Sequence, residues 1–216
     1  PRPVVLEGDI SQEDLGLDAN ELRWAAEYCG AVIHNAASLT FHATRADAEP
    51  YRSNLAGTQH VLDFARNAGI REFHHVSTAY VAGLRTGQIL ETEVDLGQEL
   101  GNDYEKSKLA SEKLVRAADF LDPPTIYRPG IIIGDAENGY TTTYHGFYAA
   151  LQLAHTLAQQ LEKGPDGRVQ GQVVRLSLNG DETKHLVPVD WVSRVMAHVI
   201  THRAAHGQTY HLTPAQ

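Results

Sequence analysis

The sequence lacks the features that mark secreted, membrane-spanning and nucleic-acid-binding proteins. It holds a single cysteine, Cys29, which cannot form an internal disulfide, so the composition favours the reducing cytoplasm. No apolar run reaches the roughly 20 residues that a helix needs to cross a bilayer. Basic residues number 18 against 27 acidic ones and form no cluster, which disfavours binding to nucleic acid or to an anionic membrane.

The apolar residues instead form short runs separated by amphipathic stretches, as in an α/β protein. Strands are predicted at residues 4–6, 31–33, 73–78, 125–127, 186–187 and 210–212. Helices are predicted at residues 54–67, 104–118, 148–161 and 191–202. Continuous apolar strands that alternate with helices indicate a doubly wound parallel sheet, Rossmann-like, with helices on both faces.

A glycine-rich turn is also missing. A dinucleotide-binding fold begins with a strand, a G-x-G-x-x-G turn and a helix whose N-terminus receives the pyrophosphate. No such segment occurs here, so we expect an N-terminally incomplete fold without its first βαβ unit. The expected organisation is a dinucleotide-binding core over residues 1–134. A small C-terminal substrate-binding lobe follows over 135–216, with a loop at 163–171 and elements that return to the sheet.

A tyrosine and a lysine lie four residues apart at the start of a predicted helix. The spacing of Tyr104 and Lys108 places both side chains on one helix face. A neighbouring ammonium favours the phenolate, so we expect a lowered pKa for Tyr104 and proton exchange with a substrate oxygen. The pair occurs by chance in many proteins, and its context decides its meaning.

Small and polar residues follow three of the predicted strands. Ser77-Thr78 ends one strand, Asn35-Ala36-Ala37 another and Arg128-Pro129-Gly130 a third. Open parallel sheets bind ligands at this edge. Helix or turn capping is the alternative for the two hydroxyls, and tight strand–helix packing is the alternative for the alanines.

Taken together, these motifs resemble the extended short-chain dehydrogenase/reductase family over residues 4 to about 212. The matching pieces are Gly8-Asp9-Ile10, Asn35-Ala36-Ala37, Asn54-Leu55-Ala56-Gly57-Thr58, Val76-Ser77-Thr78, Tyr104-x-x-x-Lys108 and Arg128-Pro129-Gly130. Segments 32–37, 73–83, 127–135 and 185–192 most resemble its thioester-reductase and fatty-acyl-reductase (male-sterility-like) branch.

The resemblance implies a catalytic set of four residues. Tyr104 would donate the proton, and Lys108 would hold the nicotinamide ribose and lower the tyrosine pKa. Thr78 would bind the substrate carbonyl, and Asn54 would support the proton relay through water.

The resemblance also implies a cofactor-binding set. Its members are Asp9, Ile10, Asn35, Ala36, Ala37, Ser77, Tyr104, Lys108, Pro129 and Gly130. Asp9 and Ile10 would flank the adenine, and Ala36 and Ala37 would line the ribose and pyrophosphate path. Ser77 would lie beside the nicotinamide, while Pro129 and Gly130 would contact its carboxamide. The implied cofactor is NADP, with NAD left open.

The implied activity is reduction of a small-molecule or carrier-bound acyl thioester to an aldehyde or alcohol. A nucleotide-sugar epimerase or dehydratase, or a hydroxysteroid-like dehydrogenase, is an alternative because such enzymes share the same centre. A non-catalytic dinucleotide-binding regulatory module is a second alternative, which the Tyr–Lys pair disfavours. Residues 140–148 would face the substrate or form a threonine-rich loop. His198 and His202 have metal-binding spacing but no third ligand, so no metal site is predicted.

Overall fold

Four parallel strands form the central sheet of the computed structural model, which describes residues 3–142, 147–161, 164–166 and 183–214. In spatial order they are β1 (Ala31–His34), β2 (Glu72–Val76), β3 (Thr125–Pro129) and β6 (Thr209–Leu212). A second, two-stranded parallel sheet pairs β4 (Ile131–Ile133) with β5 (Leu186–Pro188). Strand β6 comes from the end of the chain and still joins the central sheet beside β3.

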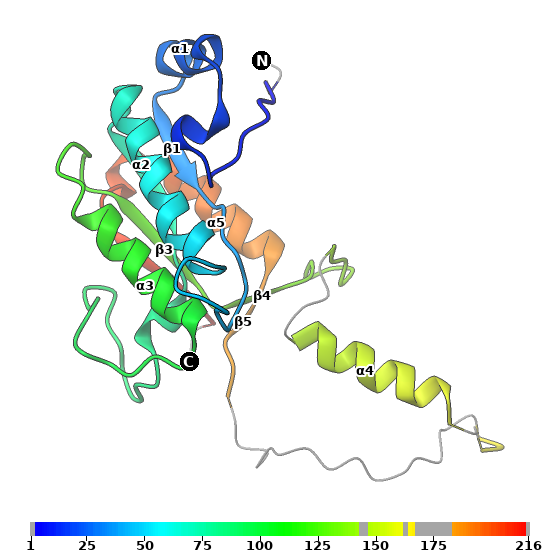
Figure 1. Ribbon diagram of the computed structural model, residues 1–216. Helices are drawn as coiled ribbons and strands as arrows, with labels where there is room; N and C mark the ends of the chain where they lie inside the picture. Colours follow the sequence, from blue (N-terminus) through cyan, green and yellow to red (C-terminus); the bar gives the residue numbers. More distant parts are fainter. Residues whose placement is uncertain (1–2, 143–146, 162–163, 167–182, 215–216) are drawn as a thin grey trace.

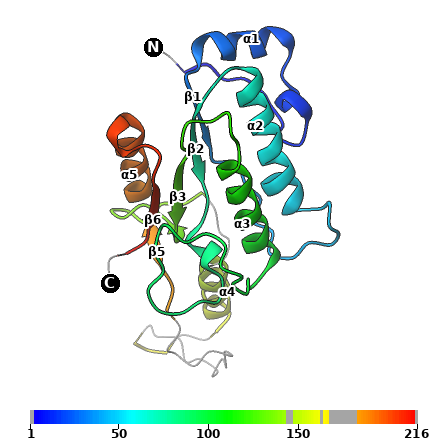
Figure 2. The same cartoon turned by 90° about the vertical axis from the view of Figure 1, so that its left-hand side faces the viewer.

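Helices cover both faces of this sheet (Figures 1 and 2). Helices α2 (Gly57–Asn67) and α3 (Asp103–Arg116) lie side by side on one face, and α1 (Ala19–Tyr28) packs into the same core. Helix α5 (Val189–Thr201) covers the other face, while α4 (Phe147–Gln159) lies apart from the sheet. This arrangement confirms the predicted doubly wound parallel fold.

Each face of the sheet has its own apolar core. The first core joins α1, α2 and α3 to the sheet and includes Val61, Leu62, Ala65, Phe73, Val115 and Ile126. The second core lies under α5 and includes Tyr127, Val187, Val192, Val199 and Leu212. Because β2 and β3 are buried on both faces, the polar groups at their ends are held in fixed positions.

Local sequence signals explain where the helices begin. Asp18 accepts hydrogen bonds from the Asn20 and Glu21 amides while the Glu21 carboxylate accepts from Asp18, a capping box that starts α1. Asn102 caps α3 through its side-chain oxygen, which accepts a hydrogen bond from the Glu105 amide. A π-helical turn, η2 (Arg52–Ala56), leads directly into α2. Short 3₁₀ turns are η1 (Glu13–Gly16), η3 (Ala79–Ala82) and η4 (Arg203–Ala205).

The structure corrects one predicted strand and adds two elements. Residues 4–6 do not form a strand: no described strand pairs with them, and Val4 and Val5 are 59% and 90% exposed. Helix α1 and strand β4 were not predicted, although the capping box is a sequence signal for the former. The other predicted elements agree with the observed ones to within a few residues.

Parts of the chain fall outside the described residues. These include residues 143–146 of the predicted 140–148 segment and most of the predicted loop at 163–171. The division at 134/135 stays a prediction. Among the described residues, every helix is too short or too polar to cross a membrane.

Candidate active site

The C-terminal ends of the parallel strands open into one cavity of about 760 Å³. The strand ends contribute Asn35, Ala37, Ser77, Thr78, Pro129 and Gly130. Helix α3 contributes Tyr104, Glu105 and Lys108, and later segments add Ile131–Ile133, Tyr140, Tyr148 and Lys184. Residues from distant parts of the sequence therefore meet at the edge where open α/β sheets bind ligands.

Tyr104 is partly buried near the start of α3, and its ring centre lies 6.0 Å from that of Phe41, with the two ring planes nearly perpendicular. Burial raises the pKa of the phenol; a hydrogen bond with Thr78 lowers it, and the charge of Glu105 raises it further. The prediction that the Tyr104 pKa is lowered is wrong, because the net effect of its surroundings is to raise that pKa. Tyr104 is therefore a protonated phenol at neutral pH, which suits a proton donor.

Lys108 lies one helical turn further along, and its side chain is almost fully buried. Its ammonium donates a hydrogen bond to the Val76 carbonyl oxygen at 2.7 Å. Burial lowers the Lys108 pKa to about 8, although the charge of Glu112 raises it. The ammonium is thus fixed to the end of β2 and keeps its charge at neutral pH.

Thr78 combines the two predicted interpretations of its hydroxyl. Its Oγ1 accepts a hydrogen bond from the Tyr80 amide at 3.3 Å and so caps η3. The same hydroxyl donates to the Pro129 carbonyl at 3.4 Å and contacts the Tyr104 phenol. The cap fixes the position of Thr78, and the contact with Tyr104 makes it part of the site.

Ser77 lines the cavity and is hydrogen-bonded to a buried ionic cluster outside the lining. Its hydroxyl donates to Glu112 Oε2 at 2.6 Å, and Arg128 binds the same carboxylate through contacts of 2.6 and 3.1 Å. Arg116 adds contacts of 2.8 and 3.0 Å to Glu112 Oε1. Burial raises the pKa of Glu112, but these donors and the Arg128 charge outweigh it and hold the pKa below its ordinary value.

Asn54 lies outside the cavity, fully buried in the π-helical turn η2. Its side chain donates to the Ser38 carbonyl and the Ser107 hydroxyl and accepts from the Ser38 amide, at 2.7 to 3.0 Å. Its own carbonyl accepts from Thr58, whose hydroxyl contacts His34 Nε2 at 2.9 Å. Asn54 therefore fastens the loop after β1 to α3; the predicted role in a proton relay stays a prediction.

The remaining predicted residues divide between the cavity and its surroundings. Asn35, Ala37, Pro129 and Gly130 line the cavity. Gly130 is also required by packing, because a Cβ there would lie 2.5 Å from the His185 carbonyl oxygen. Three other predicted cofactor ligands lie outside the lining: Asp9, Ile10 and Ala36.

Asp9 and Ile10 have local roles in the structure. Asp9 accepts hydrogen bonds from the Ser11 amide and the Gln12 side chain, which orders the turn before η1. Ile10 packs onto Gly57 at the start of α2, where a Cβ would lie 2.9 Å from Ile10 Cδ1. Their predicted contacts with adenine stay predictions.

Sequence reasoning missed Tyr80 and the ionic cluster around Glu112. Tyr80 lines the cavity, and its hydroxyl is buried without a hydrogen-bond partner among the described residues. An orphaned hydroxyl in a cavity wall is suited to a polar ligand atom. No short motif could reveal Glu112, because its partners come from β2, β3 and the far end of α3.

Comparison with known proteins gives the family. A model described as "Male sterility protein", one of the NAD-binding family models, matches residues 1–196. The chain belongs to this family. It is 23% identical over 229 residues to the nonribosomal peptide synthetase asaC of Aspergillus flavus, covering 98% of this chain and 20% of that protein. The family confirms the resemblance to the male-sterility-like branch that the motifs gave.

Two solved structures resemble this male-sterility-family domain. The terminal R domain from the myxalamid PKS-NRPS biosynthetic pathway is 30% identical, with a TM-score of 0.74 over 98% of this chain and 50% of that one. A UDP-glucuronic acid 4-epimerase from Bacillus cereus shares the fold at 19% identity, with a TM-score of 0.68 over 95% and 59%. The family domain thus spans a fifth to about three fifths of the proteins it resembles here.

Proposed function

We propose that this domain reduces an acyl thioester with a nicotinamide dinucleotide, NADPH in preference to NADH. The observation that carries the proposal is the meeting of Thr78, Tyr104 and Lys108 at the cavity at the sheet edge. Support comes from the family match and from the likeness to a terminal R domain of a PKS-NRPS pathway.

The residues at the cavity fit the nicotinamide end of such a cofactor. Ala37 and Gly130 contribute small residues to the cavity lining, and a polar set of hydroxyl, phenol and ammonium lines the same cavity. Lys108 would hold the nicotinamide ribose, and Pro129 and Gly130 would contact the carboxamide. The bound reduced nicotinamide would supply the hydride that adds to the thioester carbonyl carbon.

Thr78 and Tyr104 would stabilise the negative charge that develops on the thioester carbonyl oxygen. The hydroxyls of Thr78 and Tyr104 lie close together at the cavity, and each could turn its proton from its present partner to one carbonyl oxygen bound beside them. Tyr104 would transfer its proton to that oxygen, and its burial keeps the proton in place until then. The hemithioacetal would then lose its thiol and leave the aldehyde, and a second reduction would give the alcohol.

Carrier protein or coenzyme A would present the acyl group. Two of the proteins named above are a nonribosomal peptide synthetase and a terminal R domain of a PKS-NRPS pathway, and on this likeness we propose a carrier-bound thioester as the preferred substrate. We propose the cytoplasm as the compartment, because Cys29 is a free, partly buried thiol.

The test replaces Tyr104 by Phe in the full-length protein. We expect kcat to fall by roughly 10²- to 10⁴-fold while the affinity for NADPH is kept, because only the proton donor is lost. The matched control is Tyr28→Phe, which removes a hydroxyl from a 65% exposed side chain at the end of α1, outside the cavity lining, and should leave kcat within a factor of two or so.

Turnover and substrate class are measured together. NADPH absorbance is followed with a panel of acyl thioesters and nucleotide sugars for the wild type and both variants. Undiminished turnover in Tyr104→Phe would exclude the proton-donor role. Activity on nucleotide sugars with none on thioesters would replace the proposed substrate by that of an epimerase or dehydratase. Tight NADPH binding with no activity on either class would favour a regulatory module.

A further inference from the structure

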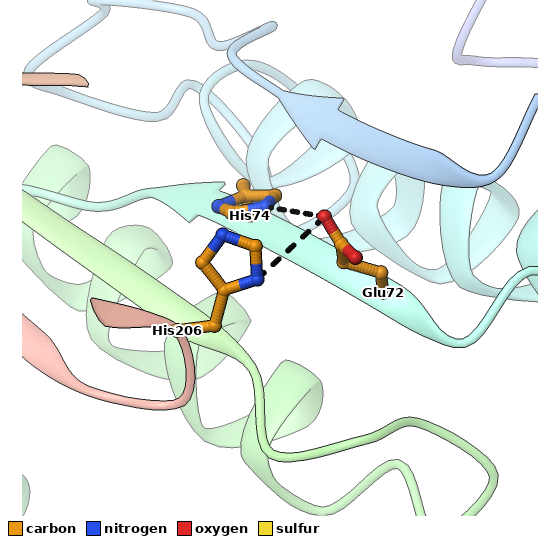
Figure 3. A group of neighbouring side chains, drawn as sticks. All are labelled: Glu72, His74 and His206. Carbon is orange, nitrogen blue, oxygen red and sulfur yellow. Dashed lines mark hydrogen bonds and ion pairs between the residues drawn. The ribbon is translucent and has the colours of Figure 1, made fainter. Parts of the chain in front are cut away.

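A second cluster of chemically versatile side chains lies at the opposite edge of the central sheet. Glu72 and His74 come from the start of β2, and His206 comes from the turn between η4 and β6 (Figure 3). The two segments are far apart in the sequence and are separated in the sheet by β3. This cluster takes no part in the proposed reduction, whose residues lie at the C-terminal ends of the strands.

Three potential ligand atoms converge in this cluster. His74 Nε2 lies 3.2 Å from Glu72 Oε1, and His206 Nδ1 lies 3.7 Å from the same oxygen. One ligand atom from each residue lies within 4.8 Å of the other two. Ligands about 2.0–2.1 Å from a tetrahedral Zn²⁺ ion are roughly 3.3–3.4 Å apart, and the two distances to Glu72 Oε1 are close to this spacing.

The ring nitrogens that face away from this point are already bound. His74 Nδ1 lies 3.0 Å from the buried Tyr127 hydroxyl. His206 Nε2 lies 3.1 Å from each of the Val199 and Ile200 carbonyl oxygens, which can only accept, so this nitrogen carries the proton. In the tautomer that has its proton on Nε2, the His206 Nδ1 lone pair is available to a metal ion on the side of Glu72. Metal-binding histidines are held by outer hydrogen bonds of this kind.

The surroundings are partly closed. The His74 ring is fully buried, its plane is perpendicular to that of His206, and the ring centres are 4.9 Å apart. A cavity of about 400 Å³ borders Glu72 and His206 and also touches the exposed Arg203. The cavity gives an ion access from solvent and leaves room for a water molecule as a fourth ligand.

We propose that Glu72, His74 and His206 bind one divalent cation of the zinc class through Oε1, Nε2 and Nδ1. The ion would fasten the turn before β6 to the start of β2 across β3. Because only the folded chain brings the three ligands together, binding would stabilise the fold. A glutamate that bridges two histidines by hydrogen bonding alone is the alternative that the experiment must separate from this site.

The experiment measures metal content and thermal stability of the untagged protein. After treatment with EDTA and dialysis, ZnCl₂ is added and the bound zinc is quantified; we expect about one ion per chain. At a free zinc concentration of about 100 Kd, we expect the Tm to rise by roughly 5–10 °C over the EDTA-treated protein.

Variants locate the ion. Glu72→Gln and His206→Gln change partly exposed side chains, and we expect both to lose the bound zinc and the rise in Tm. The matched control is His198→Gln/His202→Gln, which removes two exposed, stacked histidines at the C-terminal end of α5 and should keep both effects.

Three results would overturn the proposal. They are an unchanged Tm with no zinc retained by the wild type, full zinc retention by His206→Gln, and loss of zinc only in the α5 control. In a crystal soaked with zinc, we expect an anomalous peak between the three ligand atoms; a peak only elsewhere would exclude the site even if His206→Gln failed to fold.

Discussion

Two groups of polar residues lie on α3 and at the ends of β2 and β3, and they differ in how fully their polar atoms are hydrogen-bonded. We call the cluster of Ser77, Glu112, Arg116 and Arg128 the lower layer, and the cavity residues Thr78, Tyr80, Tyr104 and Lys108 the upper layer. In the lower layer, the Glu112 carboxylate has contacts with Ser77, Arg116 and Arg128, all between 2.6 and 3.1 Å. In the upper layer, Thr78 contacts Pro129 at 3.4 Å, and the neighbouring Tyr80 hydroxyl has no partner among the described residues. The lower layer is saturated with hydrogen bonds, whereas the upper layer keeps some capacity unused.

This difference assigns separate tasks to neighbouring residues. A saturated ionic cluster holds the ends of β2 and β3 against α3, and it makes the position of Thr78 independent of any ligand. Buried polar groups that are left underused have a cost in stability, which proteins accept where a ligand must bind. We therefore expect changes in the lower layer to act on stability and changes in the upper layer to act on turnover.

The largest expected effect is that of Glu112→Gln. The variant leaves Arg128 buried without its counter-charge, which should lower the free energy of unfolding by about 3–5 kcal/mol. The matched control is Asp122→Asn, because Asp122 pairs with Arg71 at 2.9 Å but both side chains are exposed; we expect a loss below about 1 kcal/mol. Urea denaturation of the two variants measures both values, and equal losses would contradict the assigned role of burial.

A second prediction concerns acid. The pKa of Glu112 is lower in the folded than in the unfolded protein, so its contribution to stability is present above the unfolded pKa of about 4.3 and is lost as the pH falls below it. The difference in unfolding free energy between wild type and Glu112→Gln should therefore shrink between about pH 5 and the folded pKa. A difference that stays constant down to pH 3 would show that Glu112 is not the group that titrates.

The upper layer could be predicted from the sequence because its residues lie in short motifs. Tyr104 and Lys108 are one helical turn apart, and Thr78 directly follows an apolar strand. The short continuous apolar runs that alternate with helices predicted the parallel sheet, because strands buried on both faces need such runs. What the sequence could not give is the sign of the Tyr104 pKa shift, because burial depends on Phe41 and the cavity wall, which the tyrosine's own segment does not contain.

The lower layer and the opposite edge were not predictable for the same physical reason. In the sequence, Glu112 is indistinguishable from an ordinary helix glutamate. Only the fold brings Arg128 of β3 into contact with it. Glu72, His74 and His206 have no common spacing, and only the return of β6 to the sheet brings them together. The strand expected at residues 4–6 failed because an apolar run forms a strand only where another strand pairs with it.

The smallest expected effect on stability, and the sharpest test of the two layers, is that of Lys108→Met. Burial lowers the Lys108 pKa from 10.5 to about 8, so the folded protein disfavours the charged form by about 3 kcal/mol at 1.36 kcal/mol per pKa unit. The lost hydrogen bond to Val76 offsets about 2 kcal/mol of this. At pH 7 the variant should therefore be inactive yet roughly 1 kcal/mol more stable than the wild type.

The difference in stability between Lys108→Met and the wild type should change with pH in a defined direction. Between about pH 8 and 10.5 the unfolded wild type binds a proton that the folded protein has released, so wild-type stability rises with pH through this window. Lys108→Met lacks this titration, and its advantage should vanish and then reverse as the pH approaches 10. If the variant were instead several kcal/mol less stable at pH 7, with a curve parallel to the wild type, Lys108 would belong to the stabilising layer with Glu112.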